Sequence, residues 1–348
     1  MKLFLENGAV FEGQSFGAKV SVAGEAVFNT GMVGYPETLT DPSYAGQILV
    51  LTYPLVGNYG VPDKKFWESE KIQIAGLVVS EYSLEHSHAS AKESLAAWLT
   101  RSKIPAMTGV DTRAITKLLR ERGVMLGRLS HDGKKGKFED PNKRNLVAEV
   151  SPDRKRVYGE GSKTILAVDC GMKENIVRSL ARDGVRVVRV PWDYDFSKEH
   201  YDGLFLSNGP GDPERCDATI ASLKKAMRKG TPILGICLGT QLLALAAGAK
   251  TYKLKYGHRS QNQPCSAKLG KKRTYITSQN HGFAVDANTL PKEWKVWFTN
   301  ANDGSVEGIR HAEMPWRAVQ FHPEAAPGPT DTAWIFDDFI AEVKGKKP

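Results

Sequence analysis

The pattern of apolar and polar positions divides the chain into two parts of different character. In the second part, apolar runs of strand length alternate with helix-forming segments. We predict strands at 164–169, 185–190, 203–206 and 233–236. We predict helices between them, at 173–183 and 217–229. This alternation is typical of a parallel, doubly wound sheet, and the strand-rich segment 275–321 is expected to extend it.

The first part of the chain mixes short strand patterns with helical patterns. Strands are predicted at 47–52 and 74–79, and helices at 90–99 and 112–122. Residues 132–162 are basic and interrupted by glycine and proline, as expected of a linker. The predicted fold class is α/β, with a smaller mixed α/β domain before a doubly wound, mostly parallel sheet. The predicted divisions are a domain at 1–131, the linker at 132–162 and a domain at 163–348.

Composition narrows the class of protein. At 348 residues the chain is long enough for two domains, and 41% hydrophobic with 25% charged residues is typical of a globular protein. No apolar run approaches the roughly 20 residues that cross a bilayer, and Glu6 interrupts the first apolar residues too early for a signal peptide. Four cysteines without a disulfide-like spacing indicate a reducing compartment. We therefore expect a cytoplasmic protein with no membrane contact.

The net charge of +9 does not by itself indicate binding to nucleic acid. Much of the excess lies within the predicted linker, at Lys134, Lys135, Lys137, Lys143, Arg144, Arg154, Lys155 and Arg156. No aromatic platform or recognised nucleic-acid fold accompanies these residues. We expect a solvated basic linker or a docking surface for an acidic partner, and no nucleic-acid partner.

One segment combines a strand, a sharp turn and a helix around a cysteine. The apolar run 233–236 meets Cys237, which Gly235 and Gly239 flank, and a helix-forming stretch follows at once. A nucleophile at such a turn needs small neighbours because its backbone is strained, as in the G-x-S-x-G elbow of hydrolases. The helix N-terminus also favours the thiolate form of cysteine. These features favour a nucleophilic Cys237 over a buried structural cysteine.

A base and an orienting carboxylate occur further along the chain. The alternation at 318–321 predicts a strand that ends at His322, because Pro323 cannot continue a sheet ladder. Residues two apart in extended backbone point to the same side, so His322 and Glu324 are expected to face one site. With Cys237 they would form a nucleophile, a base and an orienting group.

A turn-rich loop follows the strand predicted at 203–206. Gly209, Pro210 and Gly211 place this loop at the C-terminal edge of the sheet, where open α/β sheets bind ligands. Its backbone N–H groups, with that of Leu238 after the nucleophile, would line an oxyanion hole. Taken alone, the segment fits an ordinary turn equally well.

These motifs occur together in triad-type glutamine amidotransferases, which the second part of the chain resembles. The segments that carry this resemblance are 207–213, 235–241, 279–283 and 322–324. The first part of the chain resembles the small, glutamine-hydrolysing subunit of carbamoyl-phosphate synthetase. The segments that carry that resemblance are 28–44, 51–60 and 111–120. Other amidotransferases share the cysteine domain but not this N-terminal part.

The resemblance implies a role for each residue of the triad. Cys237 would attack the side-chain amide of L-glutamine, releasing ammonia and leaving a γ-glutamyl thioester. His322 would protonate the leaving amine and then activate water, while Glu324 orients His322. The family's glutamine contacts correspond to Ser43, Gly209, Gly211, Leu238, Gln241, Asn280, Gly282 and Phe283. Because Ser43 comes from the other domain, the resemblance implies a site at the domain interface.

The resemblance also implies a division of labour between two chains. This chain, which carries no P-loop for ATP, would supply ammonia without a cofactor of its own. A large synthetase subunit would use ATP, Mg²⁺ and bicarbonate to make carbamoyl phosphate, and would receive ammonia through an internal tunnel. Whether the product serves pyrimidine or arginine synthesis is left open by the sequence.

The remaining histidines and cysteines are expected to be structural. His86 and His88 have no third metal ligand nearby in the sequence, so a solvated loop is expected there. His281 fits the glutamine-binding segment as a structural residue. Cys170 has neither the pair of glycines that flanks Cys237 nor a base motif, so we expect a small core residue there. We therefore predict no metal site.

Two other functions stay open, and one position departs from the family pattern. A free-standing γ-glutamyl cysteine hydrolase would need no partner and no N-terminal part. A catalytically inactive homologue would be expected to lose a triad residue, and all three are present. Thr240 stands where amidotransferases often carry histidine. It is not a triad member, and it is expected to affect helix packing or signalling between subunits.

Overall fold

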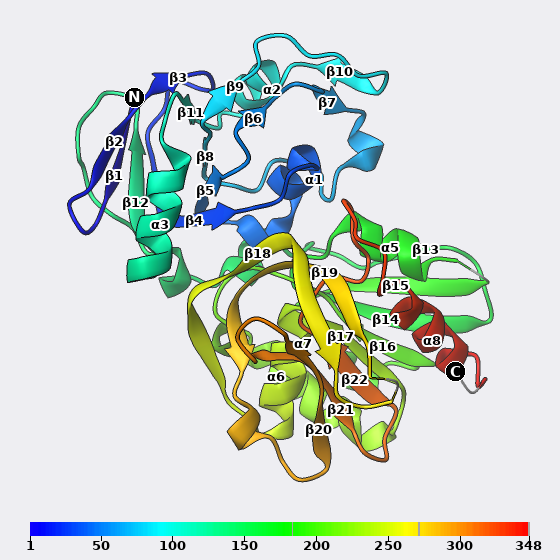
Figure 1. Ribbon diagram of the computed structural model, residues 1–348. Coiled ribbons are helices and arrows are strands. Elements are labelled where there is room, and N and C mark those ends of the chain that lie inside the picture. Colours follow the sequence, from blue (N-terminus) through cyan, green and yellow to red (C-terminus); the bar gives the residue numbers. More distant parts are fainter. Residues whose placement is uncertain (183, 271, 347–348) are drawn as a thin grey trace. The chain divides into compact units, whose positions relative to one another are not determined.

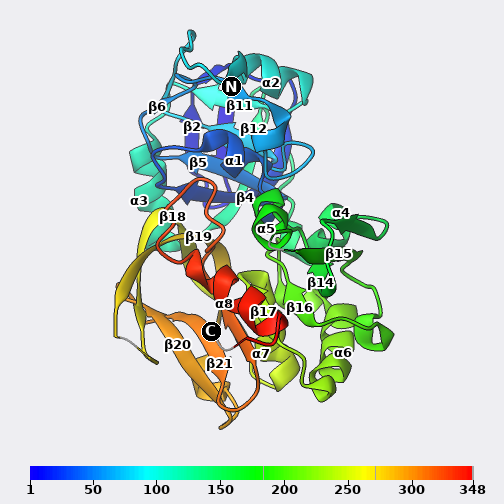
Figure 2. The same ribbon diagram turned by 90° about the vertical axis from the view of Figure 1, so that its right-hand side faces the viewer.

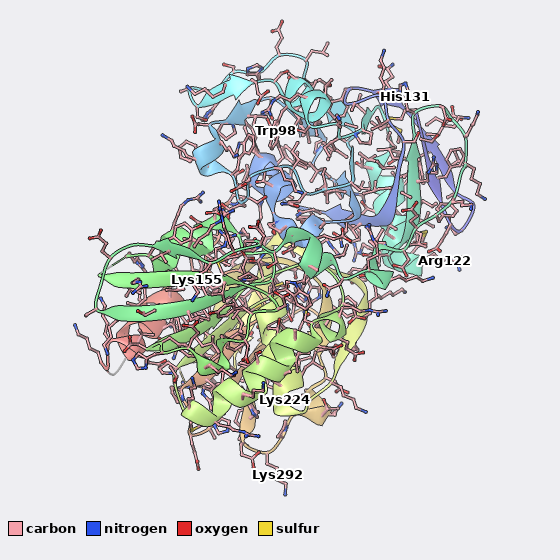
Figure 3. All side chains as sticks on the ribbon, turned by 180° about the vertical axis from the view of Figure 1, so that it is seen from behind. Trp98, Arg122, His131, Lys155, Lys224 and Lys292 are labelled. Atoms are coloured by element: carbon pink, nitrogen blue, oxygen red, sulfur yellow. The ribbon has the colours of Figure 1, made fainter. Side chains whose placement is uncertain are left out.

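The computed structural model describes residues 1–182, 184–270 and 272–346 (Figure 1). Contacts divide the chain into two compact units, Met1–Arg144 and Asn145–Pro348. The boundary falls within the predicted linker, and the later part of that stretch forms α4 (Leu146–Val150) and β13 (Arg156–Tyr158). Lys155, labelled in Figure 3, lies 3.1 Å from the Glu199 carboxylate. Part of the basic stretch is therefore neutralised within its own unit.

The first unit is built on an eight-stranded mixed sheet with the order β2-β1-β12-β4-β5-β8-β11-β3. Its strands are β1 (Lys2–Leu5), β2 (Val10–Glu12), β3 (Gln14–Ser15), β4 (Val22–Asn29), β5 (Gln47–Leu51), β8 (Gly76–Val78), β11 (Ala106–Thr108) and β12 (Met125–Ser130). The central strands β4, β5, β8 and β11 are parallel, and antiparallel strands flank them. Two small additional sheets pair β6 (Leu55–Val56) with β9 (Glu81–Tyr82) and β7 (Val61–Pro62) with β10 (Ala91–Glu93).

Three helices accompany this sheet: α1 (Tyr35–Thr40), α2 (Leu95–Arg101) and α3 (Thr112–Arg122). The predicted helix 112–122 is confirmed, with the Asp111 carboxylate accepting from Ala114 N at its start. The helix predicted at 90–99 is wrong in its first half, which is β10. The helix begins only after Ser94, whose hydroxyl accepts a hydrogen bond from Ala97 N at 3.2 Å. Trp98 of α2, labelled in Figure 3, is fully buried in the core of this unit.

The second unit contains a ten-stranded sheet with the order β13-β15-β14-β16-β17-β22-β21-β20-β18-β19. Its other strands are β14 (Lys163–Asp169), β15 (Val185–Pro191), β16 (Gly203–Leu206), β17 (Ile233–Ile236), β18 (Thr251–Ala267), β19 (Thr274–Val285), β20 (Trp294–Asn300), β21 (Val306–His311) and β22 (Trp316–Val319). The run from β15 to β22 is parallel, and β21, β20, β18 and β19 extend it with antiparallel pairing. The predicted doubly wound sheet and its strand-rich extension are confirmed.

Helices cover both faces of this second sheet (Figures 1 and 2). They are α5 (Glu174–Leu180), α6 (Asp217–Ala226), α7 (Leu238–Ala247) and α8 (Trp334–Val343). Along β14, Leu166 and Val168 pack with α6 and α7, whereas Ile165 and Ala167 pack with α5 and α8. Alternate residues of a buried parallel strand thus serve two separate cores. Of the helix predicted at 173–183, residue 183 lies outside the described residues.

None of the helices in the described part of the chain combines the length and the apolar character needed to cross a membrane.

Candidate active site

Cys237 occupies a strained turn between β17 and α7. Its backbone has φ 54° and ψ −105°, a conformation that non-glycine residues rarely adopt. The flanking glycines are required by contact. A Cβ on Gly235 would lie 2.7 Å from the Gly239 backbone, and one on Gly239 would lie 2.3 Å from Leu206 O. The predicted strand–turn–helix is therefore present, and its glycines let three backbones approach each other closely.

The Cys237 thiol is nearly buried and faces the strand β19. Cys237 is 2% exposed. Its S–H donates to the Asn280 carbonyl oxygen, with the sulfur 3.7 Å from that oxygen. Within the described residues, His322 Nε2 is buried without a hydrogen-bond partner. The thiol therefore points to Asn280 here, and a contact with His322 Nε2 requires the sulfur to turn away from the Asn280 carbonyl.

His322 and Glu324 form a buried pair. His322 Nδ1 lies 2.6 Å from Glu324 Oε1, and both side chains are almost fully removed from solvent. The strand expected to end at His322 ends earlier, at Val319. The two residues meet because the chain turns, with Ala325 N donating to His322 O at 3.2 Å. The expected proximity is thus present, but a turn rather than extended backbone produces it.

Lys173 is a member of this site that the sequence analysis missed. Its Nζ lies 3.2 Å from Glu324 Oε1 and donates to Ala325 O at 2.5 Å, and the residue is 4% exposed. Asn175 Nδ2 donates to Glu324 O at 2.5 Å. Lys173 lies directly before α5, after the strand β14. A lysine at the C-terminal edge of a parallel strand was the available signal, because ligands bind at that edge.

The charges of these groups reinforce each other. Burial disfavours an imidazolium, but the Glu324 carboxylate and the Cys237 sulfur outweigh it and raise the pKa of His322 to about 10. Burial also disfavours the Glu324 carboxylate, but Lys173 and His322 outweigh it and lower the pKa of Glu324 to about 2. At neutral pH the site therefore holds a carboxylate between two cations.

The residues predicted to bind glutamine fall into two groups. In the second unit, Gln241 Nε2 donates to Phe283 O at 3.0 Å and to Gln320 Oε1 at 3.1 Å, so α7 is joined to the segment 279–283. Gly209 packs closely between the residue after β14 and the first residue of α7. A Cβ at Gly209 would lie 2.1 Å from Cys170 O and 2.8 Å from Leu238 Cδ2. The remaining members of this group are Gly211, Leu238, Asn280 and Gly282, which belong to the same unit. Ser43 is buried in the first unit, in the turn Pro42–Tyr44, and its contact with glutamine stays a prediction.

The remaining sequence candidates have plain structural surroundings. Cys170 is fully buried, and burial raises the pKa of its thiol well above the ordinary value, which is unsuited to a nucleophile. Thr240 is fully buried in α7, and its hydroxyl has no hydrogen-bond partner among the described residues. His281 lies beside two residues that the sequence analysis did not select, His258 and Glu307. These three come from β18, β19 and β21, so only strand pairing brings them together.

Two protein families match this chain. The class-I glutamine amidotransferase family matches residues 166–342, and the carbamoyl-phosphate synthase small chain, CPSase domain, matches residues 3–129. The chain belongs to the class-I glutamine amidotransferases. Its N-terminal part identifies it, within them, as a carbamoyl-phosphate synthase small chain. Class-I amidotransferase domains need no cofactor.

Curated relatives resemble almost the entire chain. The multifunctional protein CAD of Squalus acanthias is 54% identical over 97% of this chain and 16% of its own length. The mitochondrial carbamoyl-phosphate synthase [ammonia] of Homo sapiens is 47% identical over 99% of this chain and 24% of its own length. A glutamine amidotransferase structure from Thermotoga maritima is 21% identical over 53% of this chain and 86% of its own, with a TM-score of 0.37. The chain thus spans less than a quarter of the length of these curated relatives.

Proposed function

We propose that this carbamoyl-phosphate synthase small chain hydrolyses L-glutamine and delivers the ammonia to a synthetase that makes carbamoyl phosphate. The observation that carries the proposal is the buried Cys237 elbow beside the His322–Glu324 pair. All three lie in the segment that matches the class-I amidotransferases. A nucleophile, a base and an orienting carboxylate are the groups that acyl transfer through a covalent intermediate requires.

In the first step, Cys237 gives its thiol proton to His322, and the thiolate attacks the side-chain carbonyl carbon of glutamine, so that a C–S bond forms and the carbonyl oxygen becomes an oxyanion. The charge that develops on the oxygen is met by backbone N–H groups, for which Leu238 at the start of α7 and the loop at Gly209 and Gly211 are the candidates. The C–N bond then breaks as His322 gives its proton to the amine, and ammonia leaves. The raised pKa of His322 keeps that proton in place until it is needed.

In the second step, neutral His322 accepts a proton from water, which attacks the thioester carbonyl. The C–S bond breaks, glutamate leaves and the sulfur regains its proton through His322. Glu324 keeps the imidazole in one orientation throughout, because its Oε1 holds Nδ1 and Lys173 holds the carboxylate. Glutamine is held by the predicted contacts, among which Gln241 and Phe283 are already joined by a hydrogen bond.

We propose that the partner of this chain is a large synthetase chain or the remainder of a fused multifunctional protein. Supporting this, the chain has the small-chain domain at 3–129, and the relatives continue far beyond the matched segment. ATP and Mg²⁺ would act in that partner. A cytoplasmic location is proposed from the four free cysteines, although the human relative is named as mitochondrial.

A second candidate function is supported by the relative whose name specifies ammonia. In a synthetase of that type the ammonia would come from solution, and the small chain would not hydrolyse glutamine. The complete triad favours hydrolysis in this chain. A free-standing γ-glutamyl hydrolase is disfavoured by the N-terminal unit, which such an enzyme does not need.

The test is to measure glutamate release from L-glutamine by the purified chain, with and without an added large synthetase chain. Hydrolysis that rises and saturates near an equimolar ratio supports the proposal. Cys237→Ser should abolish hydrolysis while synthesis from free ammonia by the complex continues. Hydrolysis that the partner leaves unchanged would indicate a free-standing hydrolase, and none in either condition would indicate the ammonia-fed alternative.

A further inference from the structure

Three buried side chains converge in the second unit, one of them from the segment 279–283, and the proposed reaction uses none of them. They are His258 on β18, His281 on β19 and Glu307 on β21. His258 Nδ1 lies 3.2 Å from Glu307 Oε1, and His281 Nε2 lies 3.6 Å from the same oxygen. The three donor atoms all lie within 4.8 Å of one another.

The outward-facing nitrogen of each imidazole is already occupied. His258 Nε2 lies 2.9 Å from the Asp303 carboxylate, and His281 Nδ1 lies 2.9 Å from the Phe283 carbonyl oxygen. Both partners are acceptors and lie closer than the acceptors at the other nitrogens, at 2.9 Å against 3.2 Å, so in the neutral form these two nitrogens carry the hydrogens. In a neutral imidazole the other nitrogen then presents a lone pair, and both lone pairs point at Glu307. Imidazoles fixed in this way by a carboxylate or a carbonyl are typical of metal ligands.

The Glu307 carboxylate requires a positive charge nearby. It is 0% exposed, and its Oε2 has no hydrogen-bond partner among the described residues. Apart from the two imidazoles, its Oε1 accepts a long hydrogen bond of 3.5 Å from Asn300 Nδ2, and no lysine or arginine of the described chain pairs with it. A buried carboxylate that faces two lone pairs is unfavourable unless a cation lies between them.

The distances from the Glu307 carboxylate to the two imidazole nitrogens match those between ligands of a zinc ion. Nitrogen and oxygen ligands of tetrahedral zinc lie about 2.0–2.2 Å from the metal, which places two ligands roughly 3.4 Å apart. The observed separations of 3.2 and 3.6 Å bracket this value. Gln279 Oε1, at 3.2 Å from His281 Nε2, is placed to complete the shell. Two imidazoles select zinc over magnesium or calcium, which prefer oxygen ligands.

We propose that His258, His281 and Glu307 bind a structural zinc ion that clamps β18, β19 and β21 together. The consequence for the site lies in β19, because His281 stands between Asn280 and Gly282. Asn280 O is the acceptor of the Cys237 thiol, so the ion would hold the strand that faces the nucleophile. The zinc takes no part in the reaction, and its presence is independent of whether the chain hydrolyses glutamine.

The first experiment measures the metal content of the full chain in a Cys237→Ser background, which removes the nucleophile as a competing zinc ligand. After purification without chelator and dialysis, elemental mass spectrometry should find about one zinc ion per chain, as for a closed structural site. His258→Gln and Glu307→Gln should each lose it. His200→Gln is the matched control, because His200 is an exposed histidine of the same unit, and it should retain the zinc.

A second measurement guards against misfolded variants. Asp303→Asn changes the outer partner of His258 but keeps a side-chain oxygen that can accept from Ser305 N, as Asp303 Oδ1 does at 3.0 Å. The position is exposed, so the variant should leave the circular dichroism spectrum unchanged. It should weaken zinc binding by roughly 10- to 100-fold, as loss of an outer carboxylate does elsewhere. Co²⁺ loaded in place of zinc should give visible absorption bands of tetrahedral coordination, which Glu307→Gln abolishes.

The proposal is overturned if the Cys237→Ser chain neither holds zinc nor takes up added Zn²⁺ or Co²⁺ in an equimolar amount. Equal zinc content in Cys237→Ser and in its Glu307→Gln derivative would overturn it as well. In either case the Glu307 charge would be balanced by a proton on an imidazole.

Discussion

Lys173 Nζ lies 3.2 Å from Glu324 Oε1, and both side chains are almost completely excluded from solvent. The same carboxylate oxygen lies 2.6 Å from His322 Nδ1. One oxygen therefore links a buried lysine to the proposed base. This arrangement holds Glu324 ionised, fixes its position and so sets the orientation of His322.

Loss of the Lys173 charge should impair hydrolysis without removing any triad residue. Lys173→Met keeps the length of the buried stem but leaves the Glu324 carboxylate without its strongest cation, so the pKa of Glu324 should rise. We expect kcat/KM for glutamine to fall by up to roughly a hundredfold, the cost of a misplacement of about 1 Å. Lys225→Met, at an exposed position with a 4.0 Å ion pair, is the control. Unchanged kcat/KM in Lys173→Met would show that Glu324 needs no such support.

His322 and Glu324 should contribute unequally to catalysis. His322→Asn removes both proton transfers, whereas Glu324→Gln removes only the orienting charge. Loss of the orienting carboxylate is the milder lesion in comparable triads. We therefore expect glutamine hydrolysis to fall further in His322→Asn than in Glu324→Gln, measured as kcat in folded proteins. The opposite ranking would contradict the assigned roles.

The His322–Glu324 pair should stabilise the folded protein most in weakly acidic solution. The pKa of His322 is raised to about 10, so its contribution is complete below the pH of about 6.5 at which an unfolded histidine titrates. That contribution declines as the pH rises towards 10. The pKa of Glu324 is lowered to about 2, so its contribution is complete above about pH 4.5 and is lost as the pH falls towards 2.

Urea unfolding at several pH values tests this dependence. The difference in unfolding free energy between the wild type and Glu324→Gln should be largest between about pH 4.5 and 6.5 and should shrink on either side. A difference that grows from neutral to alkaline pH would mean that His322 is not protonated in the folded state.

Gly239, two residues after the nucleophile, should be irreplaceable. In Gly239→Ala the new Cβ would lie 2.3 Å from Leu206 O, so the backbone of α7 must shift. Overpacking of this kind costs about 1–3 kcal/mol, and the shift displaces Cys237 as well. We expect lower thermal stability and loss of hydrolysis. Gly328→Ala is the control, because its Cβ would meet only an atom at 3.9 Å. Full activity in Gly239→Ala would exclude a strained elbow.

The parts of the site that depend on local spacing were predictable from the sequence. Gly235, Cys237 and Gly239 lie within one strand–turn–helix, where each glycine has a local cause. The parallel sheet was predictable because buried strands and helices alternate along the chain. The segment 90–99 failed because a helix pattern cannot show that Ser94, rather than Ser90, begins the helix.

Relationships between distant strands were not predictable in this way. Lys173 and Glu324 meet because β14 and β22 lie in one parallel sheet, separated by β16 and β17. His258 and Glu307 meet His281 through the pairing of β18, β19, β20 and β21, whose register no single segment encodes. The turn that joins His322 to Glu324 was mistaken for a strand because alternation at 318–321 continues past the point where pairing stops at Val319.

The central claim is that Cys237 carries the γ-glutamyl group, and intact-mass measurement tests it most directly. The chain is mixed with L-glutamine, quenched in acid within one turnover and analysed by mass spectrometry, with peptide mapping of the modified residue. We expect the mass of the wild-type chain to increase by one γ-glutamyl group, located at Cys237. The increase should be absent in Cys237→Ser. In Glu324→Gln a larger fraction of the chain should carry the adduct, because loss of the orienting carboxylate slows hydrolysis of the thioester. Glutamate formation with the adduct on another residue, or undiminished in Cys237→Ser, would contradict the account.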